Sequence, residues 1–160
     1  MNPRNLRLQL ETWVQSELAA KNELVERLGV MERCIAEARD ADLSEAASAT
    51  DELLRGGVMR MENLRALLTE LGRLFEVDGS TLTLSSITER LETLGESTAG
   101  LKRLRARLRD ATADVLKRGR RIGMLASYHC GILDDLFEKI AADSGGRPGA
   151  SRGALVDAQG

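Results

Sequence analysis

Residues 3–39 read PRNLRLQLETWVQSELAAKNELVERLGVMERCIAEAR, and the spacing of the apolar residues in this stretch decides the fold class. Most successive apolar positions are three or four residues apart, which places them on one face of an α-helix. Pro3 is tolerated in the first turn of a helix. We therefore predict one long helix over residues 3–39, with an apolar stripe made of Leu6, Leu10, Trp13, Leu24, Leu28, Met31, Ile35 and Ala38.

A second long helix is predicted over residues 43–76, directly after a tight connection at Asp40-Ala41-Asp42. We expect Asp42 to cap this helix and Glu45 to complete a capping box, because a carboxylate can accept from the free N–H groups of the first turn. Two long helices joined by so short a link form an antiparallel hairpin. The expected core stripe of the second helix is Leu43, Ala47, Thr50, Leu54, Met61, Leu64, Leu68, Leu71 and Phe75.

A short third helix is predicted over residues 86–94. Asp78-Gly79-Ser80 is typical of a turn and should end the second helix. Ser86 and Glu89 have the spacing of a capping box, which marks the start of a helix.

The last helix is predicted over residues 101–142 and continues the same apolar periodicity. Arg118 and His129 stand at two stripe positions where an apolar residue was expected, and three glycines fall within the helix. Glycine lowers helix propensity, so the part after about residue 117 is predicted to be only conditionally helical. Residues 144–160 contain five glycines and one proline and are predicted to form a flexible tail.

These elements predict an all-α fold, an elongated antiparallel bundle in which a coiled-coil hairpin packs with a long third helix. We expect residues 1–143 to form a single domain. Aromatic residues make up only 2% of the chain, which disfavours an all-β fold. The sequence has no apolar run long enough to cross a membrane. Because it also has no signal-peptide core, we expect a cytoplasmic protein.

The composition argues against an enzyme, a cofactor and a zinc site. A helical bundle of this kind has a narrow seam as its core, with little room for a polar active-site cavity. Tyr128-His129-Cys130 invites a nucleophile hypothesis, but adjacent helical residues point about 100° apart. His129, Cys34 and Cys130 are too few for a zinc finger, which needs four ligands. We expect the two cysteines to be buried thiols, with a redox pair as the alternative.

Charge is unevenly distributed along the chain. Residues 1–100 hold 11 basic and 18 acidic residues, whereas residues 101–160 hold 12 basic and 7 acidic residues. Most of the basic excess lies between Lys102 and Arg121. The favoured interpretation is that this run neutralises acidic faces of the first two helices. The alternative is contact with phosphates or an anionic membrane surface.

The second half of the last helix is the candidate partner-binding surface. Off-stripe apolar residues there suggest a second apolar face, and an amphipathic helix from a partner can dock against such a surface. The alternative is that the same side chains form this protein's own core or a homodimer seam. The predicted binding residues are Ile122, Met124, Leu125, Tyr128, Ile132, Leu133, Leu136, Phe137 and Ile140.

Along nearly its whole length, the chain resembles the FlgN-type flagellar export chaperones. The resemblance follows the order of the elements more than their individual letters. It is carried by Lys21 in the first helix, the Ala41-Asp42-Leu43 turn, Leu67-Leu68-Thr69-Glu70-Leu71, the small Leu82-to-Leu94 segment, Arg120-Arg121 with Ser127 and Ile132-Leu133, and the closing Val156-Asp157-Ala158-Gln159-Gly160, which is similar to the family's terminal Tyr-Asp-x-x-Gly.

The resemblance implies a cytoplasmic, non-enzymatic chaperone of flagellum assembly by type III secretion. Such a chaperone covers the amphipathic terminal helices of hook-associated proteins at the hook–filament junction and presents them to the export apparatus. The alternative function is a self-associating coiled-coil scaffold or adaptor, whose mass would change with its own concentration. A nucleic-acid or membrane-surface binder is a third and less favoured alternative, and its binding would weaken steeply with salt.

Overall fold

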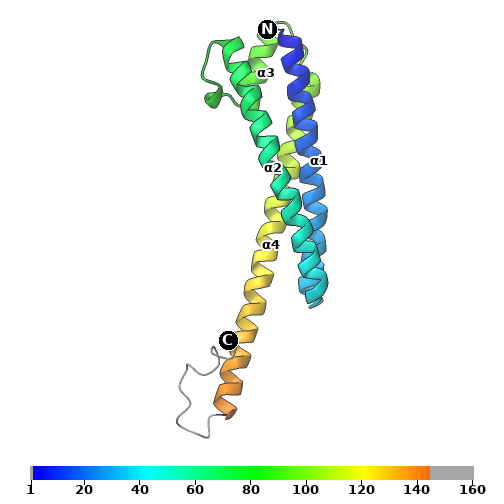
Figure 1. Cartoon of the computed structure of the whole chain (residues 1–160), viewed down its shortest axis with the longest axis vertical. Helices are drawn as coiled ribbons and strands as arrows, with labels where there is room; N and C mark the ends of the chain where they lie inside the picture. Colours follow the sequence, from blue (N-terminus) through cyan, green and yellow to red (C-terminus); the bar gives the residue numbers. More distant parts are fainter. Residues whose placement is uncertain (1, 145–160) are drawn as a thin grey trace, which may run out of the picture. The chain divides into compact units, whose positions relative to one another are not determined.

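The computed structural model describes residues 2–144, with side chains over residues 2–140. In this part of the chain it contains four α-helices, one short 3-10 helix and no strand, which confirms the predicted all-α bundle (Figure 1). The chain divides into two compact units, Met1–Ile122 and Gly123–Gly160. Residues 145–160, and with them the predicted flexible tail and the closing sequence motif, lie outside the described residues.

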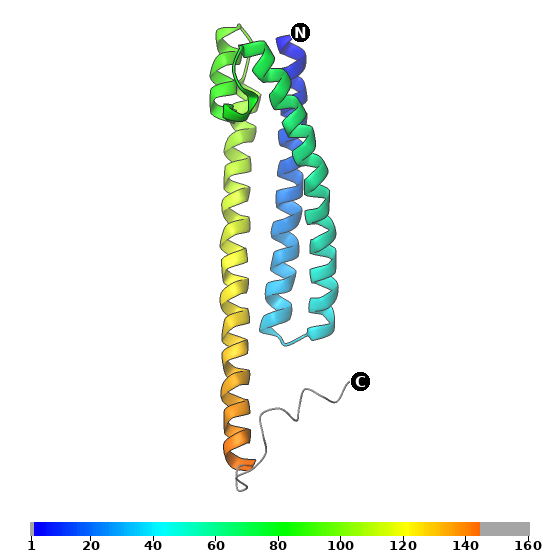
Figure 2. The ribbon, with the colours of Figure 1, turned by 60° about the vertical axis from the view of Figure 1, so that its left-hand side comes forward.

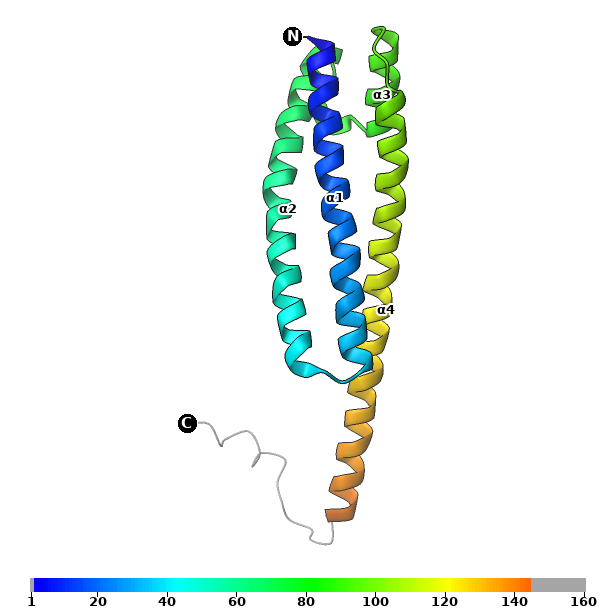
Figure 3. The same cartoon turned by 90° about the vertical axis from the view of Figure 1, so that its right-hand side faces the viewer.

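α1 (Pro3–Ala36) begins as predicted and ends earlier than predicted. The Asn2 side chain caps its start by accepting a hydrogen bond from the N–H of Arg4 at 3.0 Å. Its end is followed by Ala38 in the left-handed region, at φ +52°, which turns the chain within three residues. The antiparallel hairpin expected from so short a link is present, and α1 and α2 pack against each other along it (Figure 3).

α2 (Asp40–Phe75) begins three residues before the predicted start, so the prediction that Asp42 caps it is wrong. The N-cap position is Arg39, which makes no side-chain capping bond. Asp42 lies inside the first turn, where its carboxylate accepts from Arg39 Nη1 at 3.0 Å. Asp40 and Asp42 still favour the helix start, because negative charge is stabilising near the N-terminal end of the helix dipole.

The second helix ends at the predicted break. Glu76 adopts the left-handed conformation at φ +55°, and a 3-10 helix, η1 (Gly79–Thr81), follows. Asp78 accepts from the N–H of Ser80 at 2.9 Å, and this bond lowers the pKa of the Asp78 carboxyl. The turn folds back closely on α2, because a Cβ at Gly72 would lie only 2.7 Å from the Val77 carbonyl oxygen.

α3 (Leu84–Thr93) begins two residues before the predicted start, and its capping box is not the predicted Ser86–Glu89 pair. The Thr83 hydroxyl accepts from the N–H of Ser86 at 3.1 Å, and the Ser86 hydroxyl accepts from the N–H of Thr83 at 2.9 Å. Ser86 therefore occupies the third helical position and not the cap. Figure 2 shows α3 beside the start of α4 (Ala99–Ser144).

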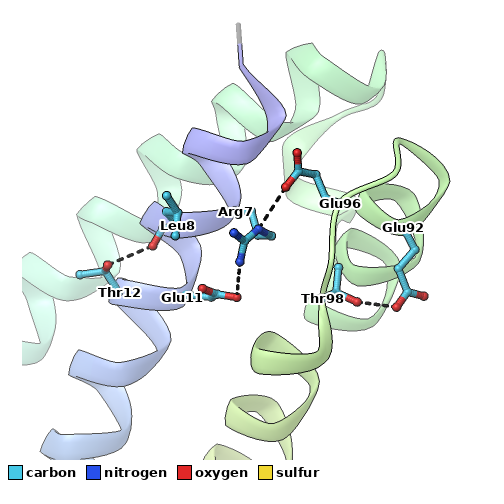
Figure 4. Close-up of polar contacts among 7 residues, drawn as sticks. All are labelled: Arg7, Leu8, Glu11, Thr12, Glu92, Glu96 and Thr98. Atoms are coloured by element: carbon cyan, nitrogen blue, oxygen red, sulfur yellow. Dashed lines mark hydrogen bonds and ion pairs between the residues drawn. The ribbon is translucent and has the colours of Figure 1, made fainter.

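The main core lies where α1, the end of α2, α3 and the start of α4 meet. Its fully buried members come from all four helices, so the hairpin alone does not complete it. Arg7 joins two of these parts, because its guanidinium contacts Glu11 in α1 at 2.8 Å and Glu96 before α4 at 3.2 Å (Figure 4). The buried cluster consists of Leu6, Leu10, Val14, Leu67, Leu71, Leu82, Ile87, Leu91 and Leu101.

An ion pair explains why Arg118 occupies a position of the apolar stripe of α4. Its guanidinium reaches Glu32 of α1 at 3.5 Å, and Arg121 reaches the same carboxylate at 2.7 Å. A Cβ on Gly29 would lie 2.9 Å from the nearest Arg118 nitrogen, so the glycine leaves the space that the arginine uses. At this level of the first unit, an ion-pair cluster takes the place of apolar packing between α1 and α4.

Candidate functional site

The second unit is helical from Gly123 to Ser144, in direct continuation of α4 from the first unit. The part of α4 after residue 117, which was predicted to be only conditionally helical, is thus helical in the structure. A methyl group at Gly119, Gly123 or Gly131 would meet nothing within 4 Å, so no close contact requires these glycines.

No side chain between Gly123 and Ile140 is buried, and the apolar ones are among the most exposed of the described residues. Met124 and Phe137 are exposed to 74% and 67% of their full areas. Of the nine predicted binding residues, Ile122, which ends the first unit, and Leu125 are half-buried. The other seven are exposed, namely Met124, Tyr128, Ile132, Leu133, Leu136, Phe137 and Ile140.

Five apolar residues form a face along the helix, four of them exposed and Leu125 half-buried, with acidic residues on the opposite side. Leu125, Ile132 and Leu136 recur at helical spacing, and Leu133 and Phe137 widen the face. Asp134 and Glu138 lie four residues apart on the far side, as expected from 3.6 residues per turn. We call Leu125, Ile132, Leu133, Leu136 and Phe137 the α4 face.

Tyr128 and His129 contact each other edge to face, with ring centroids 6.2 Å apart and planes at 87°. The expectation of two buried thiols holds for Cys34 alone, because Cys130 is exposed. Both cysteines are free thiols.

The basic run from Lys102 to Arg121 is only partly neutralised as expected. Arg118 and Arg121 pair with Glu32 of α1, whereas Lys102 pairs with Glu92 of α3 at 2.6 Å. Among the ion pairs of the described residues, none joins this run to α2. The ion pairs of the run therefore support the expected neutralisation of α1 but give no support for that of α2.

α2 carries a second exposed apolar surface, which includes Leu54 and Met61, two residues that were predicted to lie in the core. Leu54 and Met61 are exposed, together with Val58 between them. The residues that turn toward the hairpin interior at this level are Leu53, Gly57 and Leu64, one stripe further around the helix. We call the exposed residues Asp51, Leu54, Val58, Met61 and Arg65 the α2 stripe.

A groove of about 500 Å³ lies along the α2 stripe and is walled on the other side by α1. Trp13 and Leu24 of α1 line it, opposite Val58 and Met61. Its shape is held by polar contacts between the helices: Trp13 Nε1 donates to the Arg60 carbonyl at 2.8 Å, and Arg60 Nε contacts Glu17 at 2.9 Å. Two adjacent apolar stripes on α2 were the sequence signal for this groove.

The chain matches no protein-family model, no curated protein and no solved structure. Within the described helices, no stretch combines the length and apolar character needed to cross a bilayer. The same residues contain no group of three His, Cys, Asp or Glu side chains arranged to hold a metal.

Proposed function

We propose that this protein is a cytoplasmic, FlgN-type export chaperone that covers the amphipathic terminal helix of a flagellar hook-associated protein at the hook–filament junction. The observation that carries the proposal is the exposed α4 face. Large contiguous apolar surfaces on soluble proteins mark sites of interaction. The proposed client covers the apolar area of the α4 face that would otherwise remain in contact with water.

An amphipathic helix is the partner that fits the α4 face best. The face follows one helix over residues 125–137, a length of about 18 Å at 1.5 Å per residue. A partner helix can insert its own side chains along such a face at three- and four-residue steps. Covering one exposed leucine contributes ~1.5–3 kcal/mol, so several such contacts offset the cost of association.

The proposed role is non-enzymatic and needs no cofactor, because masking a helix requires only complementary burial. It accounts for the apolar composition of the α4 face without assigning chemistry to His129. The choice of hook-associated clients rests on the family resemblance of the sequence.

Isothermal titration of the full chain with a hook-associated protein tests this proposal. We expect the wild type to bind in a defined ratio, and Leu133→Asp combined with Leu136→Asp to weaken binding by about 100-fold or more, because central apolar contacts dominate such interfaces. Asp134→Ala with Glu138→Ala changes the opposite side of the same helix turns and is the matched control.

The control pair should change affinity less than about threefold. Circular dichroism of each variant reports whether its helix content is retained. If the variant with Leu133→Asp and Leu136→Asp binds the client with unchanged affinity, the assignment of the α4 face is refuted. If the wild type binds no hook-associated protein, the proposed client class is refuted.

A further inference from the structure

The α2 stripe has the spacing of a helix-packing seam. Its five residues follow one another at steps of three, four, three and four, the pattern by which two helices pack along each other in a coiled coil. At its centre, Leu54, Val58 and Met61 are exposed to 55%, 63% and 49% of their full areas. The groove beside it is walled by α1, so a helix seated there would contact both helices of the hairpin.

Two opposite charges flank the same side of this seam. Arg55 and Glu62 are seven residues apart, which is about two turns, and both are exposed. Arg55 pairs with Asp51 on its own helix, and its side chain remains 77% exposed. No ion pair is formed by Glu62 among the described residues, so its carboxylate is available to a partner at this flank.

An antiparallel copy of α2 complements this arrangement. With a twofold axis between residues 59 and 60, Val58 packs opposite Met61 of the second copy. In the same register Arg55 lies opposite Glu62 of the second copy, and the twofold axis repeats both contacts. The aliphatic stem of Arg65 then covers Leu54 of the second copy.

The same charges disfavour the neighbouring register. When the second copy slips by one heptad, the axis moves to residue 56 and Arg55 faces Arg55 of the second copy. Like charges opposite each other in a helix pair are destabilising. The apolar centre therefore attracts a second copy, and the two flanking charges select one antiparallel alignment.

We infer that the α2 stripe binds a second copy of this chain, giving a twofold dimer in which two hairpins form an antiparallel four-helix bundle. This inference does not rest on the proposed chaperone function, because it uses α2 and leaves the α4 face to a client. A self-complementary pattern of charges fits a symmetric partner better than an unrelated helix, which would need no such symmetry.

Sedimentation equilibrium of the full chain across a wide range of concentration tests the dimer. We expect Arg55→Glu and Glu62→Arg each to raise the dimer dissociation constant by about 10-fold or more, since each places like charges opposite one another twice. The combined variant restores opposite charges and should return to within about threefold of the wild type. Glu52→Arg, on α2 but off the seam, is the control and should leave the constant unchanged.

A wild type that stays monomeric at all concentrations overturns the inference. So does a dimer whose constant is insensitive to all the charge variants, because it must then use another surface. A monomer in which Val58→Asp abolishes binding of a hook-associated protein would assign the α2 stripe to a client and would also overturn it.

Discussion

Leu8 and Leu10 are two positions apart in the sequence but differ clearly in burial. Leu10 is completely buried in the main core, whereas Leu8 is 46% exposed on the same helix. We predict that Leu10→Ala lowers the free energy of unfolding by about 2–5 kcal/mol, because it leaves a cavity. Leu8→Ala should change it by about 0.5 kcal/mol or less. Urea denaturation measures both, and equal losses would contradict the position of the core.

Substitution by alanine is predicted to have opposite effects on stability at Gly72 and at Gly119. At Gly72 a methyl group would clash with the Val77 carbonyl oxygen, and at Gly119 it would meet nothing within 4 Å. Gly72→Ala should therefore destabilise the protein by about 1–3 kcal/mol. Gly119→Ala should stabilise it by up to about 1 kcal/mol, because alanine is the better helix former. Thermal unfolding, monitored by circular dichroism, measures both changes in stability. Stabilisation by Gly72→Ala would argue against the close turn.

Individual residues were predicted well where burial follows periodicity and poorly where several polar residues compete. Leu6, Leu10 and Leu71 are buried as their spacing predicted. The cap of α3 was misplaced because serines and threonines occupy most positions from 80 to 86, and each can start a helix. The choice of Thr83 depends on the reciprocal bond from Ser86, which only the folded backbone reveals.

At the scale of elements, Glu92 ties α3 to the start of α4. Hydrogen bonds from Lys102 and from Thr98 hold the pKa of the Glu92 carboxyl below its usual value. A carboxyl with a lowered pKa in the folded state adds stability that is complete above the ordinary glutamate pKa of about 4.3. This contribution is lost as the pH falls through that value toward the lower pKa of the folded state.

We therefore predict that Glu92→Gln reduces stability most at neutral pH. The difference from the wild type should shrink as the pH falls from about 5 to about 3, because the wild-type carboxyl then becomes neutral as well. Urea midpoints over this range measure it. Glu89→Gln, an exposed carboxylate on the same helix, is the control. A gap that stays constant with pH would exclude the charged form of Glu92 as its source.

The apolar periodicity predicted that α2 is a helix, but it did not predict which side of α2 faces the hairpin interior. Its apolar residues form two neighbouring stripes, and their spacing placed Leu54 and Met61 in the predicted core. In the structure Gly57 faces the hairpin interior between Leu53 and Leu64, a position that hydrophobic spacing does not favour. Choosing between two adjacent stripes depends on how α1 packs at that level, where Trp13 and Arg60 join the helices.

At the scale of the whole molecule, each of the two units carries an exposed apolar surface, and we propose a different kind of partner for each. The α4 face was predicted from sequence because this part of the helix has more apolar residues than a single core-facing stripe requires. The α2 stripe was not, because the same pattern also describes a buried seam. Periodicity shows that a surface is apolar, but only the packing of the other elements shows whether it is covered.

Hydrogen–deuterium exchange of the full chain, alone and with a hook-associated protein, tests the central claim most directly. Opening of α4 controls exchange over residues 123–140, and a helix bound to the α4 face should make that opening rarer. We predict slower exchange in these residues on complex formation, with exchange in residues 51–65 of α2 unchanged. A stable complex in which exchange over residues 123–140 stays the same would contradict the account.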